Sequence, residues 1–433
     1  MTRPTFVTAL VGIITSTMLC LMSCKEAPPE PPPHQVSIEL SVEDASCTEA
    51  WLKVSLTDAS QPRTVAVQQD GRRVLTAQMT TADSVFVVEG LLPRHTYSYV
   101  VQRLRYTSVI DVSSPVQATT MDTTSHSFSF HMDTLGVTSS MLNDATIISS
   151  VRAYAVGEVY LRDSTGHLED SPHNVVVWDG TSWKTNKLTY SGLGSGIRFV
   201  YARSGGDVWF DPWFHWDGQQ FSELPIDPVF MGIRWNKMWG SPGGGLFVVG
   251  DGGSIVLSPS QGGFWERIQS GTNVALNDVW GGSNRWAGEN VVLVAGSNKY
   301  SAGEMKLLRI NSDGVLDSIP WHMPDRRINS VWFDGHSHIF TSGGGVFRYR
   351  GEGLWSEQPV PLIYTNRIRG NAENDIWVVG DFGFAAHFNG YTWRTYPEVW
   401  LGSGDYLSLA VKGDAMIAVG SLSNRAIILR GVR

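Results

Sequence analysis

A short repeat with a period of roughly 40–45 residues, typical of four-stranded propeller blades, runs from about residue 143 to the end of the chain. Its clearest copy joins four short runs, 366–370, 374–381, 385–388 and 391–393. Asn389-Gly390, before the fourth run, is a typical two-residue hairpin turn. Because such a unit cannot bury its faces alone, successive copies must pack on one another. The repeat therefore predicts an all-β fold with a β-propeller over residues 126–433.

The last copy of the repeat is incomplete. Seven copies can be placed, and the seventh, from Tyr406 to Leu429, stops before a fourth strand. A missing strand leaves an open sheet edge. Residues 126–134 lie just before the first copy and alternate like a strand, with Phe130 where Trp183 and Trp393 stand in other copies. We expect this segment to complete the last copy and close a seven-bladed ring.

The N-terminus has the three parts of an export signal. Arg3 is followed by the apolar run Phe6–Leu19, which is too short for a convincing membrane span, and by Leu21-Met22-Ser23-Cys24. That tetrapeptide resembles the bacterial lipobox, which implies a signal peptide over 1–23, a lipid on Cys24 and a membrane anchor. The alternative is a plain signal peptide or an uncleaved anchor. Residues 24–34 contain five prolines and are expected to form an extended tether.

Short alternating runs between residues 35 and 122 predict a separate β-sandwich. Asp70-Gly71 is a strong hairpin signal between two of these runs. The segment Leu91–Tyr99 has the spacing Leu-x-Pro-x-x-x-Tyr, ending at Tyr97. It resembles the tyrosine corner of fibronectin type III domains, in which the tyrosine hydroxyl bonds the backbone near the corner. The resemblance implies a fibronectin type III-like domain over residues 35–122.

Composition excludes several classes of protein. The net charge is −8 and there is no basic cluster, so nucleic acid is not an expected partner. Cys20 and Cys24 belong to the export signal, which leaves Cys47 without a disulfide partner. The eleven histidines lack zinc-ligand spacing, and His336 and His338 are expected at the surface. No phosphate-binding loop or nucleophile elbow is present, so we expect no catalytic residues, metal or cofactor.

Two sets of repeat residues have a structural interpretation. The repeat tryptophans recur at fixed strand positions and are expected to pack between blades. Asp179, Asp217 and Asn389 stand at turns, where their side chains are expected to accept backbone hydrogen bonds rather than bind metal.

One face of the propeller is the expected binding surface. The connections from the fourth strand to the next first strand, and from the second to the third, share this face, and nearly every one of the former carries an aromatic residue. Asparagine recurs at the starts of the first strands. Aromatic rings and amides suit a sugar or a peptide. The alternative is that the asparagines cap turns and the aromatics pack their own loops. The predicted ligand-binding residues are Trp235, Asn236, Asn277, Lys299, Tyr300, Asn329, Tyr364, Asn366, Asp381 and Tyr406.

The sequence Trp-Asp-Gly-x-x-Trp at 178–183 resembles the Asp-box (BNR-like) repeat of sialidase-type propellers. The chain as a whole is more similar to uncharacterised surface lipoproteins of Bacteroidetes and Ignavibacteria-like bacteria, which implies a lipid-anchored location at the outer membrane or cell surface. We expect a non-catalytic protein that binds a glycan or protein ligand.

Two alternative functions stay open. The first is a sialidase-like glycan hydrolase or lyase, and the second is an envelope assembly scaffold like the propeller lipoprotein of outer-membrane barrel insertion. A sialidase-like enzyme would need a cluster of arginines, a tyrosine nucleophile and an acid. Its candidate arginines are Arg162, Arg198, Arg326, Arg327 and Arg367.

Overall fold

A computed structural model describes residues 37–57, 63–241, 244–258, 264–284, 289–298, 303–311, 314, 316–323, 326–335, 338–351 and 353–433. The predicted signal peptide, Cys24 and the tether lie outside these residues. Among the described residues, no helix is both long enough and apolar enough to cross a membrane. The helices there are short 3-10 turns: η1 (Asp211–Trp213), η2 (Pro228–Phe230), η3 (Asp251–Gly253), η4 (Asp381–Gly383) and η5 (Pro397–Val399).

Seven four-stranded antiparallel sheets, numbered here along the chain, occupy the described residues from 129 onward. The first sheet consists of β10 (Met141–Ser149), β11 (Arg152–Val159), β12 (His173–Trp178) and β13 (Trp183–Asn186), and the second of β16 (Val200–Ser204), β17 (Asp207–Phe210), β18 (Phe214–Trp216) and β19 (Phe221–Glu223). The third consists of β20 (Trp235–Gly240), β21 (Leu246–Gly250), β22 (Ser254–Ser258) and β23 (Glu266–Ile268). The fourth consists of β24 (Leu276–Asn284), β25 (Glu289–Gly296), β26 (Lys306–Ile310) and β27 (Leu316–Ser318). A small hairpin, β14 (Thr189–Tyr190) and β15 (Leu193–Gly194), links the first two sheets.

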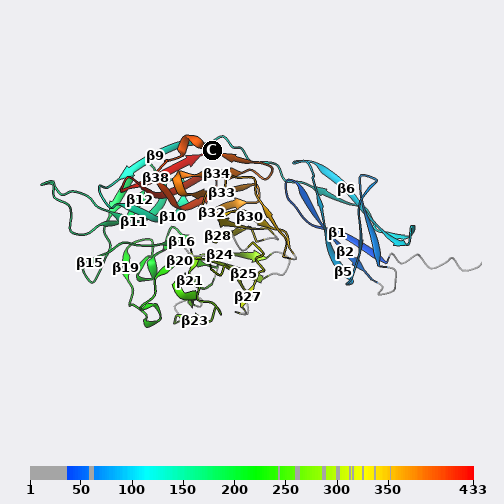
Figure 1. Cartoon of the computed structure of the whole chain (residues 1–433), viewed down its shortest axis with the longest axis horizontal. Coiled ribbons are helices and arrows are strands. Elements are labelled where there is room, and N and C mark those ends of the chain that lie inside the picture. The colour runs from blue at the N-terminus through cyan, green and yellow to red at the C-terminus, as the bar shows by residue number, and fades with distance from the viewer. Residues whose placement is uncertain are drawn as a thin grey trace, which may run out of the picture.

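The remaining three sheets follow the same pattern. They consist of β28 (Ile328–Phe333), β29 (Ile339–Gly343), β30 (Gly345–Tyr349) and β31 (Trp355–Glu357); β32 (Thr365–Ala372), β33 (Asp375–Gly380), β34 (Ala385–Phe388) and β35 (Trp393–Thr395); and β36 (Asp405–Lys412), β37 (Ala415–Leu422), β38 (Arg425–Val432) and β9 (Ser129–Leu135). The first strands of consecutive sheets contact one another, and β36 contacts β10, so the sheets form a closed ring. Figure 1 shows the first strands toward the middle of this ring. The fold is a β-propeller, as the repeat predicts.

Side chains between neighbouring sheets form the core of the ring. Trp239, Trp332 and Trp377 are buried and pack against residues of the next sheet. The expectation that the repeat tryptophans pack between sheets is confirmed for these three. Asp179 and Asn389 accept hydrogen bonds from two backbone N–H groups each in their turns, as expected.

An N-terminal strand closes the ring. The strand β9 pairs antiparallel with β38 over its whole length, and Phe130 lies opposite Gly431, the register position that Trp393 occupies opposite Phe388 in the sixth sheet. Phe128 and Phe130 contact the rings of Trp377 and Tyr396. The prediction that the segment around residues 126–134 completes the last sheet is therefore confirmed, with the strand itself at Ser129–Leu135.

Two smaller sheets precede the ring and face each other across a shared apolar core. One has the order β1 (Ile38–Ala45), β2 (Glu49–Leu56), β5 (Asp83–Glu89); the other has the order β4 (Arg72–Gln78), β3 (Thr64–Gln69), β6 (Thr96–Arg105), β7 (Ser108–Val112), with β8 (Val116–Thr119) also paired to β6. Asp70 and Gly71 both have positive φ, as a type I′ hairpin turn requires. The backbone N–H of Leu92 donates to the Tyr97 hydroxyl oxygen over 2.8 Å.

The sandwich packs against turns of the fifth and sixth sheets (Figure 1). Glu49 of β2 pairs with Arg348, and the Trp51 ring meets the His338 ring edge-on with centroids 4.4 Å apart. His338 is only 2% exposed, so the expectation that it lies at the surface is wrong: β2 covers it. His336 lies outside the described residues. These turns connect first to second and third to fourth strands, so the sandwich contacts the face opposite the predicted binding surface.

The role of β9 can be tested by truncation. We expect the chain 123–433 to fold cooperatively and the chain 137–433 to melt at a clearly lower temperature, because it loses the half-buried Phe128 and Phe130, and full burial of such a side chain contributes roughly 1.5–3 kcal/mol. Circular dichroism during heating measures both. A synthetic peptide of residues 123–136, added to the shorter chain, should restore the higher melting temperature. Equal melting temperatures for the two chains would show that β9 is dispensable.

Candidate functional site

The repeat asparagines stand at irregularities of the first strands. In five of the sheets, the register of the first strand against the second shifts at the asparagine, which is left without a direct partner. Asn236 and Asn366 use their amide nitrogens twice, donating to Asp251 and Asp381 and to a main-chain oxygen of the next sheet. The amides of Asn277 and Asn329 likewise donate to backbone oxygens. These asparagines hold the ring together, which weighs against their predicted role as ligand contacts.

The residue after each irregularity is polar and points into the middle of the ring. In the sixth sheet, for example, Arg367 follows Asn366 and reaches Asp278 of the fourth sheet over 2.6 Å. The corresponding residues are all buried and meet as a central polar cluster: Asp144, Lys237, Asp278, Ser330, Arg367 and Ser408. In the sequence, each repeat asparagine is followed by a polar residue: Asp, Lys, Asp, Ser and Arg in chain order. This polar residue after the asparagine is the signal that could have revealed the cluster.

Charges in the central cluster are paired. Asp278 is completely buried and accepts hydrogen bonds from Arg367, from both terminal nitrogens of Arg369 and from Ser330. Burial would raise the pKa of Asp278, but the two guanidinium groups bring it well below its usual range. Lys237 pairs with Asp144 over 2.5 Å, and burial lowers the pKa of this lysine to about 8. With each carboxylate bonded to cations and hydroxyls, the cluster has the form of a structural core.

Side chains of two consecutive positions at the start of the first strands point in opposite directions, as in any strand. The residue just before the repeat asparagine is buried in every sheet that carries one, and Trp235 belongs to this position. Tyr406 holds the same register position in the seventh sheet and is also buried. Their polar atoms donate internally, Trp235 Nε1 to Phe230 and Tyr406 Oη to Val399. Burial therefore weighs against these two predicted ligand contacts.

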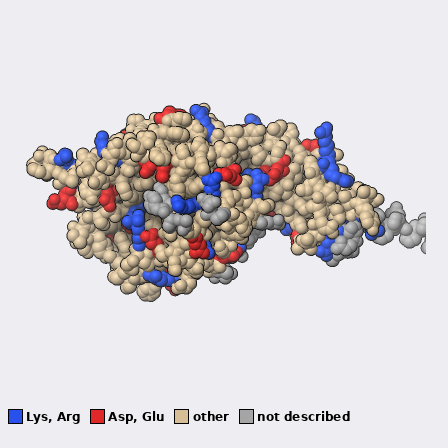
Figure 2. All heavy atoms as spheres, viewed as in Figure 1, with Lys and Arg blue, Asp and Glu red and all other residues tan. Residues whose placement is uncertain are grey.

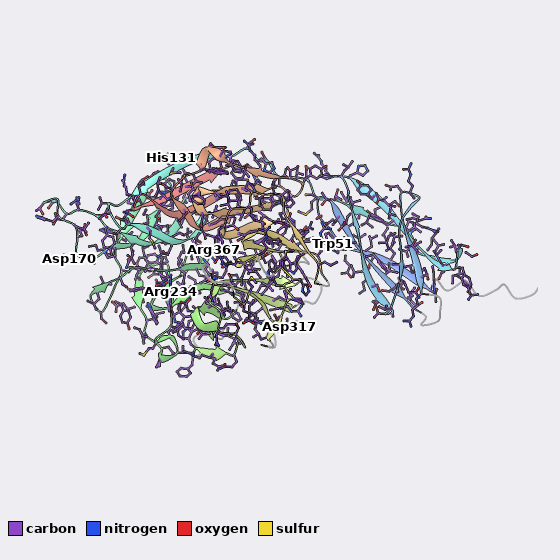
Figure 3. The ribbon with its side chains drawn as sticks, in the orientation of Figure 1. Trp51, His131, Asp170, Arg234, Asp317 and Arg367 are labelled. Carbon is purple, nitrogen blue, oxygen red and sulfur yellow. The ribbon has the colours of Figure 1, made fainter. Side chains whose placement is uncertain are left out.

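The preceding position forms a rim on the predicted binding face. The position two residues before the repeat asparagine, and its equivalent in the seventh sheet, is never buried. Its residues are Met141, Arg234, Ala275, Arg327, Tyr364 and Asp405. Tyr364 is thus the one aromatic of the predicted set that the rim presents. Asp381 accepts from Asn366, and Lys299 and Tyr300 lie outside the described residues. Figure 3 labels Arg234 and Arg367, which come from the beginnings of first strands and differ in burial.

A pocket of about 490 Å³ opens between the second and third sheets on this face. It is lined by residues 195–199, 211–214 and 232–235, all from connections on the binding face. Arg198 and Arg234 are exposed there beside the half-buried ring of Trp213. Burial, and then the nearby charge of Arg234, lower the pKa of Arg198. This pKa is raised by three nearby carboxylates, those of Asp211, Asp251 and Glu158. The pocket therefore carries mixed charge, and the two guanidinium groups are the groups in it that suit an anion.

Asp211 shapes the back of this pocket. It is 7% exposed, and its carboxylate accepts the backbone N–H groups of Arg198 and Phe199 over 3.0 Å each. Burial raises the pKa of Asp211 to about 7 in spite of these donors. The φ of Asp211 is 50°. In the equivalent turns η3 and η4 the positive φ falls one residue later, at Gly252 and Phe382. In this turn that next residue is Pro212, which cannot adopt a positive φ, so Asp211 adopts it instead.

Large apolar side chains are also exposed on the connections of this face. Phe382 is 55% exposed and has a φ of 60° where the equivalent turn of the third sheet has Gly252 at 65°. An aromatic residue in this conformation costs about 1 kcal/mol or more relative to glycine. Leu362 and Trp400 are exposed on the connections on either side of the sixth sheet, and Met231 is exposed between the second and third sheets. In Figure 2 acidic and basic side chains are interspersed over the face in view, and most of that surface carries no charge.

Three of the five arginines considered for a sialidase-like site are held elsewhere. Arg367 pairs with Asp278, Arg326 with Glu357, and Arg162 donates to the carbonyl of Gly166. Arg198 converges with Arg234, a residue outside that set. A three-arginine cluster is therefore not formed by these residues.

No protein-family model and no curated protein matches the chain. Solved structures with a similar fold include YCF48 bound to D1 peptide, with 16% identity and a TM-score of 0.49 over 70% of this chain and 95% of that chain. YCF48 from Cyanidioschyzon merolae has 14% identity and a TM-score of 0.49 over 69% and 98%. The computationally designed Ika8 protein has 11% identity and a TM-score of 0.42 over 68% and 98%. Identities this low tie no residue here to a residue of those proteins.

The central cluster predicts a sharp stability effect. Asp278→Asn leaves Arg367 and Arg369 buried without their counter-charge, and we expect a loss of about 3–5 kcal/mol in the free energy of unfolding. The matched control is Asp317→Asn, which breaks an exposed pair with Arg309 and should cost at most about 1 kcal/mol. Urea unfolding measures both. Similar small losses would mean that the central pairs contribute little.

Proposed function

We propose that the chain is a non-catalytic, lipid-anchored envelope protein whose propeller binds an acidic ligand at the pocket between the second and third sheets. The observation that carries the proposal is the pair of exposed arginines, Arg198 and Arg234, against the ring of Trp213. Arginine and aromatic residues dominate binding energy at protein interfaces. An arginine guanidinium also matches the two oxygens of a carboxylate.

A protein ligand with acidic side chains is the better match to the surroundings of the pocket. Met231 lies on the connection between the same two sheets and is 62% exposed. Phe382, on the sixth sheet, is an exposed apolar side chain elsewhere on the same face. Apolar side chains of this size suit the core of a protein interface. A glycan with carboxylate groups is the second candidate, because the arginine pair would bind its acid and Trp213 could stack on a sugar face.

The proposed architecture is a seven-bladed propeller preceded by a fibronectin type III-like domain, with boundaries at 35–122 and 126–433. The Tyr97 hydrogen bond to Leu92 and the two strand orders support the fibronectin-like assignment. The seven four-stranded sheets among the described residues support the blade number. Because the sandwich packs against the opposite face, a tether from it to Cys24 would leave the binding face open to a ligand.

Enzymatic activity is the weaker interpretation. The arginines engaged by Asp278, Glu357 and Gly166 are unavailable for a sialidase-like cluster. A role as an assembly scaffold differs from the proposed function in its partners rather than in its chemistry, since a scaffold would also use exposed loops to bind proteins.

The arginine pair can be tested with arrays of acidic peptides and of sialylated and uronate glycans. We expect the double substitution Arg198→Gln and Arg234→Gln to weaken the strongest interaction at least tenfold, since each charge-assisted hydrogen bond contributes roughly 1.5–3 kcal/mol. Binding should also weaken with added salt.

The matched control is Arg73→Gln, an exposed arginine on β4 of the sandwich, which should bind like the wild type. The hits reveal whether the ligand is protein or glycan. Wild-type affinity in the double variant would contradict the proposed site.

Anchoring is tested separately. We expect Cys24→Ser to move the exported protein from the membrane fraction to the soluble fraction, because the lipid is the proposed attachment. Immunoblots of fractionated cells measure the distribution, and Cys47→Ser, at a buried free cysteine, is the control that should stay with the membrane. Membrane association that persists in the Cys24 variant would remove the lipoprotein from the proposal.

A further inference from the structure

Where the sandwich meets the ring, three metal-ligating side chains gather. Asp334 directly follows β28, His338 directly precedes β29, and Glu373 lies in the turn between β32 and β33. One ligand atom from each lies within 4.8 Å of the other two. A turn of the fifth sheet carries Asp334 and His338, and a turn of the sixth sheet brings Glu373 next to them, although Glu373 is distant from both in sequence.

The histidine of this group is buried and aimed into it. His338 is 2% exposed, and neither ring nitrogen makes a hydrogen bond of normal geometry among the described residues. Its Nδ1 lies against Glu373 Oε1, and its Nε2 lies 3.5 Å from Glu49 Oε2. Both ring nitrogens thus face carboxylate oxygens, the arrangement in which a histidine binds an ion with one nitrogen and a carboxylate with the other.

The charge of the junction favours a cation. Arg348 pairs with Glu49, and Arg350 with Glu89. Asp334 and Glu373 add two further carboxylates. A divalent ion bound by these two carboxylates would be attracted by both negative charges, and binding it would stabilise the junction.

Space is present beside the histidine. A cavity of about 70 Å³ is lined by Trp51 and Glu49 of β2, by Glu89 of β5, and by His338 and Arg348 of the ring. Asp334 and Glu373 do not line this cavity, which therefore lies on the Glu49 side of His338. Its volume exceeds the roughly 10–15 Å³ that a single water needs, so it can hydrate the Glu49 side of the imidazole. Figure 3 labels Trp51 at the edge of the sandwich that faces the ring.

We propose that Asp334, His338 and Glu373 bind a divalent transition-metal ion, with Zn²⁺ the best match. An imidazole nitrogen excludes a typical Ca²⁺ or Mg²⁺ site, and two carboxylates make a copper(I) site unsuitable. The His338 Nδ1 side faces Glu373 and takes the ion. The Nε2 side faces Glu49, which acts as the carboxylate that orients a metal-bound histidine. Glu49 comes from the sandwich, so the ion couples the docking of the sandwich to the ring.

The test uses the full chain, stripped with EDTA and titrated with Zn²⁺. We expect one Zn²⁺ per chain by mass spectrometry of the metal, a higher melting temperature on binding, and a visible absorption band when Co²⁺ replaces Zn²⁺. Ca²⁺ should not compete. Absence of stoichiometric Zn²⁺ binding, or equal binding of Ca²⁺, would overturn the proposal.

Variants separate a metal site from a structural cluster. Glu49→Gln should weaken Zn²⁺ affinity roughly 10–100-fold, as loss of an outer-shell partner does, and Glu373→Gln, Asp334→Asn and His338→Gln should weaken it more. The metal-free Glu373→Gln chain should melt at or above the metal-free wild type, because the variant removes a buried carboxylate that lies close to that of Asp334. A lower melting temperature there, together with unchanged Zn²⁺ affinity, would mean a structural role. His131→Gln, an exposed histidine on β9, is the control that should bind Zn²⁺ like the wild type.

Discussion

Asp278 joins three sheets of the ring at one buried point. It accepts from Ser330 of the fifth sheet and from Arg367 and Arg369 of the sixth, and it lies on the first strand of the fourth. A buried carboxylate is tolerated only when cations and donors surround it. Asp144 makes a similar connection to Lys237 and Ser408. The ring axis is therefore a bonded polar core, around which the apolar layers between sheets are arranged.

The irregularity at each repeat asparagine connects this core to the binding face. It inserts one residue without a direct partner, so the next side chain turns toward the axis, and the amides of Asn236 and Asn366 bond the neighbouring sheet. The residue immediately before the asparagine is buried, and the residue two positions before the asparagine lies at the rim. Trp235 and Arg234 are adjacent in sequence and therefore have opposite environments: the tryptophan packs inside, and the arginine faces the pocket.

The two faces of the ring have different occupants. On one face, the sandwich covers turns of the fifth and sixth sheets and buries Glu49, His338 and Arg348. The other face is made of longer connections, and these carry the exposed arginines and apolar side chains. Anchoring and ligand binding, as proposed, would then occur on separate faces and would not compete for the same surface.

The local features of this chain were predictable from its sequence. The repeat, the Asp70-Gly71 turn, the hydrogen bonds of Asp179 and the closing strand at Phe130 depend on neighbouring residues or on a pattern repeated along the chain. The candidate site was predicted at the level of a face, and Tyr364 lies on its rim. Trp235 and Tyr406, two of the predicted ligand contacts, are buried, because a shift of one position reverses the direction of a side chain in a strand.

Only the tertiary structure decided which distant residues meet. The pairs Asp278–Arg367 and Asp144–Lys237 join residues from different sheets, and His338 is buried by β2, a strand of the sandwich. No local pattern encodes such contacts, because the curvature of the ring and the packing of the sandwich set the distances. The repeat thus determined the kind of fold, whereas ring closure and domain docking determined which charges are buried and which arginines line the pocket between the second and third sheets.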